Sequence, residues 1–127
     1  MSVWGIGTDI VAIGRLTKLL DRHGDRFLAR CFRESERDHF RGRRGGDLAS
    51  SVAGRWAAKE AFLKALGGPI AHIPYRDIGV VRNASGGPEL VLAGEALKAL
   101  GVSEGQRLHL TISHEREFAV ATVLIED

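Results

Sequence analysis

Two charged side chains in the run from Gly54 to Gly67 have the spacing and the chemistry of a binding or catalytic site. Glu60 and Lys64 lie one helical turn apart, on a face otherwise formed by Ala53 and Ala57. As an exposed ion pair they would stabilise a helix by only about 0.2–0.5 kcal/mol. Alternatively, the small alanines let a ligand approach, so that a carboxylate and ammonium groups share a cleft. The helix alone is consistent with both interpretations.

Two further basic residues, Arg55 and Lys59, fall within the apolar side of the same predicted helix. At 100° per residue this apolar arc is formed by Leu48, Val52, Trp56, Phe62, Leu63 and Leu66. One interpretation is that the stem of Lys59 covers apolar surface while its ammonium group stays in water. The other is that Lys59 faces the same ligand cleft as Glu60 and Lys64.

Two candidates come from other parts of the chain. Asp9 follows the apolar residues Val3 to Ile6, where a strand is expected to run into a helix, so it either caps that helix or holds a cation. His114 lies at the expected turn of a hairpin, where a polar side chain can project into a cleft. Two carboxylates from different elements, with lysines nearby, suit a Mg²⁺ ion that bridges a diphosphate. The residues by themselves therefore favour phosphoryl-type transfer.

The first half of the chain is expected to supply a strand and several helices to position these residues. Helical spacing begins at Ile10 and is expected to end at Gly24, and a second short element covers residues 27–32. Another short helix is expected around Phe40, ending at Gly42. The arginine-rich and glycine-rich stretch Arg41 to Asp47 is expected to be a loop before the central helix, whose arginines are either solvated or within reach of a phosphate.

The second half of the chain has mostly strand-like patterns. Gly67, Gly68 and Pro69 end the central helix. Strands are expected over residues 77–82 and 89–92, and a short helix over 94–100. The clearest pattern is a hairpin, with alternation from Leu108 to Ser113 and a second strand from Phe118 to Val123.

Length and composition indicate one soluble domain over residues 1–127, with 44% hydrophobic and 27% charged residues. No membrane span or signal peptide is recognisable, so a cytoplasmic location and no membrane partner are expected. The lone cysteine, Cys31, is expected to be a small buried residue. A chain of this size is short for enclosing a deep pocket, which raises the prospect of a site shared between subunits.

The net charge of +2 is distributed unevenly. Residues 15–44 contain ten lysines and arginines against five acidic residues, and most of these basic residues are three or four positions apart. Such a pattern is typical of a solvated helix face, and it would also suit an acidic protein or a polyphosphate.

Three blocks together resemble the holo-acyl-carrier-protein synthases, the small class of 4′-phosphopantetheinyl transferases. They are GIGTDIV (Gly5 to Val11), GRWAAKEAFLKALG (Gly54 to Gly67) and LTISHEREFAVA (Leu110 to Ala121). Weaker agreement extends through Phe27 to Glu36 and Asp77 to Val80, so that the resemblance covers essentially the whole chain. It implies an α+β fold, in which an antiparallel sheet packs against a long central helix with short flanking helices.

The resemblance implies an activity that moves the 4′-phosphopantetheine arm of coenzyme A to a serine of an apo acyl carrier protein or carrier domain. Adenosine 3′,5′-bisphosphate is released, and the carrier becomes active in fatty-acid or polyketide synthesis. Asp9 and Glu60 would bind Mg²⁺, and Lys64 would neutralise charge on the diphosphate. Glu60, directly or through a metal-bound water, would accept the serine proton. Arg55 and His114 would contact coenzyme A phosphates, as would Lys59.

The resemblance also implies two kinds of partner. Carrier proteins are strongly acidic and would dock on basic residues of the first helix, to which Arg15, Arg22 and Arg26 correspond. Other copies of the chain would complete a homotrimer with its active sites between subunits. Ala12 and Arg33 depart from the residues usual in the family, which affects the choice of carrier more than the chemistry.

Two rival hypotheses remain at this stage. The arginine-rich half could belong to a non-catalytic binder of nucleotides or nucleic acid, although the few aromatic residues are not interleaved with the basic run as stacking platforms would be. No nucleic-acid partner is therefore expected. A trimeric structural protein with a degenerate site is disfavoured because the carboxylates and lysines are present.

Overall fold

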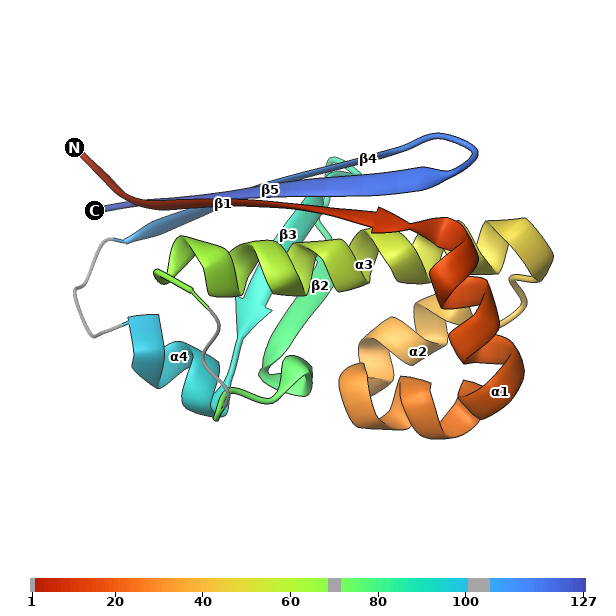
Figure 1. Ribbon diagram of the computed structural model, residues 1–127. Coiled ribbons are helices and arrows are strands. Elements are labelled where there is room, and N and C mark those ends of the chain that lie inside the picture. The colour runs from red at the N-terminus through yellow and green to blue at the C-terminus, as the bar shows by residue number, and fades with distance from the viewer. Residues whose placement is uncertain (1, 69–71, 101–105) are drawn as a thin grey trace.

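The computed structural model describes residues 2–68, 72–100 and 106–127. The chain is built around one long helix, α3, which packs along one face of a three-stranded sheet (Figure 1). In chain order the elements are β1 (Val3–Ala12), α1 (Ile13–Cys31), α2 (Glu34–Phe40), α3 (Gly45–Ala65), the 3₁₀ turn η1 (Tyr75–Asp77), β2 (Ile78–Arg82), β3 (Pro88–Leu92), α4 (Gly94–Leu100), β4 (Arg107–His114) and β5 (Phe118–Glu126).

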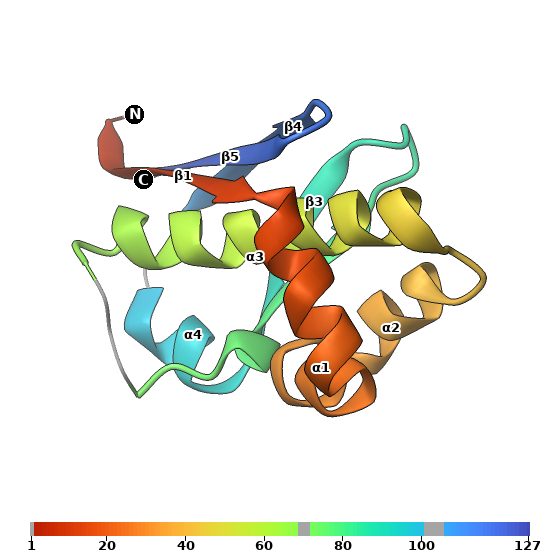
Figure 2. The same cartoon turned by 45° about the vertical axis from the view of Figure 1, so that its right-hand side comes forward.

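The three-stranded sheet has the order β1-β5-β4, with both pairs antiparallel. β2 and β3 form a separate antiparallel pair that crosses behind α3 in Figure 1 and contacts β4. Figure 2 shows α1 and α2 together at the end of the molecule opposite α4. The α+β fold with antiparallel strands and a long central helix agrees with the expectation, except that α1, at 19 residues, is nearly as long as α3, at 21.

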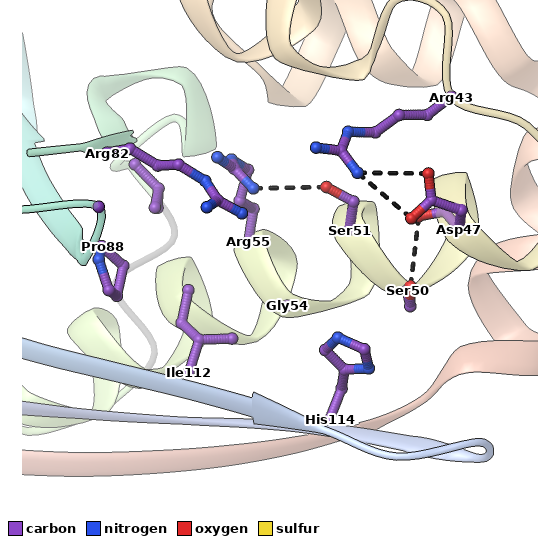
Figure 3. Close-up of a pocket in the computed structure, with 12 residues that line it drawn as sticks. Arg43, Asp47, Ser50, Ser51, Gly54, Arg55, Arg82, Pro88, Ile112 and His114 are labelled. Carbon is purple, nitrogen blue, oxygen red and sulfur yellow. Dashed lines mark hydrogen bonds and ion pairs between the residues drawn. The ribbon is translucent and has the colours of Figure 1, made fainter.

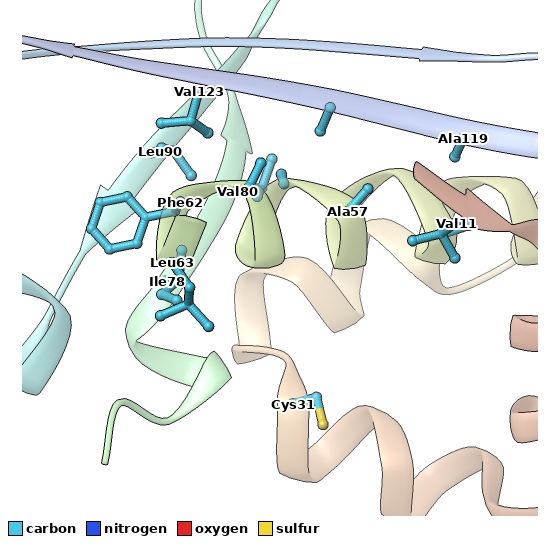
Figure 4. Packing of buried hydrophobic residues seen from close by; sticks show 14 of the residues in the cluster. Val11, Cys31, Ala57, Phe62, Leu63, Ile78, Val80, Leu90, Ala119 and Val123 are labelled. Carbon is cyan, nitrogen blue, oxygen red and sulfur yellow. The ribbon is translucent and has the colours of Figure 1, made fainter. Parts of the chain in front are cut away.

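Helix α3 is buried on nearly all sides, because the sheet covers one face and β2, α1 and α2 cover others. Its buried residues range from Ala49 near the start to Ala65 at the end, and they include the charged side chains of Arg55 and Lys59. Core side chains of both sheets point toward it (Figure 4). A helix covered all round needs no single polar face, which explains why its charges do not follow the pattern of a surface helix.

Strand β1 approaches α3 so closely that two glycines are required at the contact. A Cβ atom at Gly5 would lie 2.1 Å from the carbonyl oxygen of Ala65, and one at Gly7 would lie 2.1 Å from that of Ala61. Both obstacles are backbone atoms, which cannot move aside as a flexible side chain can. The GIG motif thus lets a strand backbone pack directly on a helix lined by alanines.

Replacing Gly7 by alanine is expected to destabilise the fold by about 1–3 kcal/mol, the typical cost of overpacking. The added methyl group also meets the backbone nitrogen of Ala65 at 2.6 Å, so α3 must shift away from β1. Gly24→Ala is the matched control, because a Cβ there has no atom within 4 Å and alanine is favoured over glycine in a helix by about 0.5–1 kcal/mol. Urea unfolding of both variants measures the difference, and equal stabilities would contradict the tight contact.

Two boundaries in the first third of the chain differ from expectation. The predicted junction at Asp9 was wrong, since β1 continues to Ala12, which pairs with Phe118 of β5, and Asp9 lies within the strand opposite Ala121. Asp9 is therefore not a helix cap. Helix α1 also continues through Gly24 to Cys31, where two elements were expected. Pairing with a distant strand and packing of the apolar side of α1 outweigh these local signals.

The other expected elements agree more closely with the structure. The helix α2, the pair β2 and β3, the helix α4 and the hairpin β4 and β5 lie where the patterns placed them. The central helix begins at Gly45, inside the stretch expected to be a loop, and is followed by Gly67 and Gly68 with positive φ angles. Pro69 and Gly101 lie outside the described residues. Cys31 is buried, as expected.

The face of the sheet turned away from α3 exposes apolar side chains. Ile6 and Ile10 of β1 are 61% and 63% exposed, and they lie opposite Leu124 and Val120 of β5. Phe118, at the start of β5, is 42% exposed. Among the described residues, no helix combines the length and the apolar character that crossing a membrane requires.

Candidate active site

The site is built from one ion pair between β1 and α3. The ammonium group of Lys64, in the last turn of α3, donates to Oδ1 of Asp9 and to the carbonyl oxygen of Thr8, at 3.0 Å each. Alternation along β1 turns Asp9 toward α3, on the same side as the buried Val11. The Asp9 side chain is 16% exposed and that of Lys64 51%, so the pair opens to solvent on the lysine side.

Glu60 lies one turn before Lys64 and is held by a residue from another element. The hydroxyl group of Tyr75, at the start of η1, donates to Oε1 of Glu60 at 2.7 Å. Burial of the phenol, followed by its hydrogen bond to Glu60, raises the pKa of Tyr75. The charge of Asp9 contributes to the same shift, which places both carboxylates in the electrostatic surroundings of this tyrosine. Tyr75 therefore stays protonated and serves as a hydrogen-bond donor.

The two carboxylates are suited to a magnesium ion that also binds a phosphate group. In the described part of the chain, each uses one oxygen for a hydrogen bond from Lys64 or Tyr75, and Oδ2 of Asp9 and Oε2 of Glu60 accept none. No cluster of three or more His, Cys, Asp or Glu side chains suited to a metal is present among residues 2–68, 72–100 and 106–127. Mg²⁺ commonly binds one or two carboxylates and completes its shell with water and substrate phosphates. Asp9 and Glu60 fit that donor set.

A second group of predicted residues lines a pocket of about 270 Å³ between the first half of α3, the β2–β3 pair and β4. Arg55 and His114 are brought together there with Arg43 and Arg82, whose side chains point into the same space (Figure 3). Among the described residues that line the pocket, Asp47 is the one acidic residue, and it is already paired with Arg43 at 3.2 Å. The pocket is therefore strongly cationic.

The arginines of the pocket also lower the pKa of the neighbouring His39. Its pKa is lowered to about 4, first by burial and then by the charges of Arg55, Arg43 and Arg82. Because the imidazole is neutral at pH 7, it adds no charge of its own. The potential of the pocket comes from the arginines, which suits a phosphate-bearing ligand.

Arg55 forms the wall of this pocket and is itself only 7% exposed. Its guanidinium donates to the hydroxyl group of Ser51 at 3.4 Å and lies 5.6 Å from the ring centre of Phe40. Its buried Nε has no hydrogen-bond partner in the described residues. Burial lowers the pKa of Arg55 to about 10, so the side chain is still charged at pH 7. An anion in the pocket would compensate this buried charge.

Within one chain, the carboxylate site of Asp9, Glu60 and Lys64 is separate from the pocket that Arg55 and His114 line. Glu60 follows Arg55 by five positions, which corresponds to a rotation of about 140° around α3. None of Asp9, Glu60 and Lys64 lines the arginine pocket. The carboxylate site and the cationic pocket therefore lie on different sides of the central helix.

Lys59 is not where the expected contact with coenzyme A phosphates requires it. Its side chain is fully buried, and its ammonium group donates to Oε1 of Glu36 at 2.8 Å and to the carbonyl oxygens of Ile78 and Tyr75 at 2.6 and 3.1 Å. Burial lowers the pKa of Lys59, and the charge of Glu36 acts in the opposite direction. All three donors are used inside the protein. We therefore leave Lys59 out of the ligand-binding set and assign it a structural role.

The three arginines predicted to bind a partner are exposed on α1. Arg15, Arg22 and Arg26 are seven and four positions apart, so they fall within about 40° of one another around the helix. They form one basic stripe, as a docking surface for an acidic protein would require.

Sequence reasoning missed Tyr75 and Glu36, the partners of Glu60 and Lys59. Nothing in the spacing of Tyr75 along the chain connects it to α3. A signal did exist for Lys59: a lysine within an apolar arc requires an acidic partner if it is buried. Arg43 is one of several arginines in the predicted loop, and no sequence motif distinguishes Arg82.

Comparison with known proteins identifies relatives over nearly the whole chain. The profile of the 4′-phosphopantetheinyl transferase superfamily matches residues 5–123. A holo-[acyl-carrier-protein] synthase of Gloeobacter violaceus is 47% identical over 94% of this chain and 90% of its own length. One of Aliivibrio salmonicida is 42% identical over 99% of each chain.

Solved structures of the same kind of enzyme share the fold. A holo-(acyl-carrier-protein) synthase of Bacillus anthracis, in complex with coenzyme A (3′,5′-ADP), is 39% identical and aligns with a TM-score of 0.80 over 97% of this chain and 96% of that one. A Chronobacterium ammoniagenes complex with coenzyme A is 34% identical, with a TM-score of 0.85 over 99% and 98% of the two chains.

Proposed function

Because the chain belongs to the 4′-phosphopantetheinyl transferase superfamily, we propose that it transfers the 4′-phosphopantetheine arm of coenzyme A to a serine of an apo acyl carrier protein or carrier domain. Adenosine 3′,5′-bisphosphate is the second product, and the modified carrier serves fatty-acid or polyketide synthesis. The observation that carries the proposal is the Asp9–Lys64 pair with Glu60 one turn away, at the edge of solvent. The relatives named holo-[acyl-carrier-protein] synthase support this choice of acceptor.

In the proposed reaction, the serine hydroxyl attacks the phosphorus atom that carries the pantetheine arm, and the bond to the adenosine phosphate breaks. Glu60 accepts the hydroxyl proton, directly or through a water molecule. Lys64 retains a third N–H beyond those donated to Asp9 and Thr8, and this donor stabilises negative charge on the diphosphate. A magnesium ion held by Asp9 and Glu60 would supply further neutralisation of the diphosphate when bound.

The cationic pocket is proposed to hold the phosphate groups of the adenosine end of coenzyme A. Arg55 and His114 line it, as the resemblance implied, and Arg43 and Arg82 add two more guanidinium groups. Guanidinium groups bind phosphate oxygens in pairs, which fixes orientation as well as charge.

We propose that neighbouring copies of the chain complete each active site in a homotrimer. The carboxylate site and the arginine pocket lie on different sides of α3, so a second copy is needed to bring a pocket beside the carboxylates. The exposed apolar face that includes Ile6 and Ile10 offers a surface for such an association. The acidic carrier would dock on the stripe of Arg15, Arg22 and Arg26, and this attraction should weaken with salt.

Intact mass spectrometry of an apo acyl carrier protein tests the proposed reaction. After incubation with this protein, coenzyme A and Mg²⁺, the carrier should gain the mass of one phosphopantetheine arm. Chelation by EDTA should prevent the gain, and a carrier whose acceptor serine is replaced by alanine should remain unmodified. Absence of the gain across several carriers, with no binding of coenzyme A, would instead favour the non-catalytic binder.

A further inference from the structure

The side chain of Tyr75 connects η1 to the central helix at two points. Its hydroxyl group donates to Oε1 of Glu60 at 2.7 Å. Its ring packs against that of Trp56, with centroids 4.6 Å apart and planes inclined by 49°. Trp56 and Glu60 are one turn apart on α3, so the ring and the hydroxyl group of Tyr75 contact successive turns of the helix.

The backbone of Tyr75 is held by the residue that precedes Glu60 on the same helix. The buried ammonium group of Lys59 donates to the carbonyl oxygens of Tyr75 and Ile78, at 3.1 and 2.6 Å. Lys59 is in turn anchored by Glu36 of α2. Two adjacent residues of α3 thus contact the two ends of Tyr75, one through its backbone and one through its hydroxyl group.

Resting on the function proposed above, we propose that Tyr75 is a positioning residue for Glu60. Its O–H group holds Oε1, and this leaves Oε2 for the divalent cation or the substrate proton. Tyr75 does not itself touch the reacting atoms. The flexible glutamate side chain is half-buried, and the phenol is the one donor to it among the described residues, so loss of the hydroxyl group would allow the carboxylate to leave its position.

Tyr75→Phe in the full chain tests this role, because phenylalanine keeps the ring and removes only the hydroxyl group. We expect the affinity for Mn²⁺, used as a paramagnetic probe in place of Mg²⁺ with coenzyme A present, to fall about 10-fold by electron paramagnetic resonance. The kcat for carrier modification should fall by a similar factor, whereas the KM values for coenzyme A and carrier should not change. The melting temperature should stay that of the wild-type protein.

Trp56→Phe is the matched control, since it alters the packing against the same ring and leaves the hydroxyl group in place. It should lower the melting temperature and preserve Mn²⁺ affinity. Tyr75→Phe could also lower the melting temperature. In that case, an equal loss of Mn²⁺ affinity in Trp56→Phe would overturn the proposal, because disturbed packing of the ring would explain the lower affinity of both variants. Wild-type Mn²⁺ affinity and kcat in Tyr75→Phe would overturn it as well. Failure of the wild-type protein to modify any carrier would count against the proposed function and not against the contact with Glu60.

Discussion

Replacing Glu60 by alanine is expected to abolish carrier modification and to leave the fold intact. The change removes a proposed metal ligand and the proposed base together, and loss of a general base alone typically lowers a rate by about 10²–10⁴-fold. The fold should survive because the Glu60 side chain is partly exposed and its hydrogen bond is to Tyr75, outside the buried core. The initial rate of mass gain by the carrier measures the effect, and circular dichroism checks the fold.

Two further variants separate the roles of Glu60. Glu60→Gln keeps a carbonyl oxygen for the Tyr75 hydroxyl group and removes the charge, so it should be as inactive as Glu60→Ala if charge and basicity matter. Glu89→Ala removes an exposed carboxylate from β3 and should leave the rate unchanged. A rate near that of the wild-type protein in Glu60→Ala would refute the assignment of this residue to the chemistry.

Replacing Lys59 by methionine is expected to cause the largest loss of stability. Glu36, which is 1% exposed, would be left buried without its partner, and breaking a buried pair in this way typically costs about 3–5 kcal/mol. The carbonyl oxygens of Ile78 and Tyr75 would also lose a donor. Urea unfolding at pH 7 measures the change in the free energy of unfolding.

The double variant Lys59→Met with Glu36→Gln shows whether the pair is responsible. The neutral amide at position 36 removes the unpaired carboxylate, and its one carbonyl oxygen can still accept from the backbone N–H group of either Arg33 or Val80, which donate to different oxygens of Glu36. Part of the lost stability should therefore return. Lys98→Met breaks an exposed pair with Glu95 and should cost no more than about 1 kcal/mol. A double variant that is stable but binds coenzyme A poorly would restore the expectation that Lys59 contacts the ligand.

The spacing of apolar residues and the positions of glycines were sufficient to predict the elements whose periodicity extends over many residues. Alternation from Leu108 to Ser113 predicted β4, and the glycines at 67 and 68 marked the end of α3. The boundary at Asp9 could not be predicted locally, because the extent of β1 depends on pairing with β5, more than a hundred residues later. Likewise, Gly24 remains helical because the apolar face of α1 packs on both sides of it.

The candidate site could be predicted only in part, for a related reason. Glu60 and Lys64 share a helix, so their spacing in the chain already indicated a common face. The contacts of Tyr75 with Glu60 and of Glu36 with Lys59 join residues 15 and 23 positions apart in different elements. Such contacts follow from packing around α3. The resemblance to a family supplied roles for Asp9 and His114 that residue spacing left open.

The contact of Gly5 and Gly7 with the backbone of α3 also determines how ordered the site is before any ligand arrives. Neither glycine nor alanine has side-chain rotamers to restrict, so the contact forms without loss of rotamer entropy. Asp9 lies two residues after Gly7, and Lys64 three residues after Ala61. The strand and the helix that carry this ion pair are therefore held together mainly by contacts of their backbones, so the pair that we propose acts on the diphosphate is already ordered before a substrate binds.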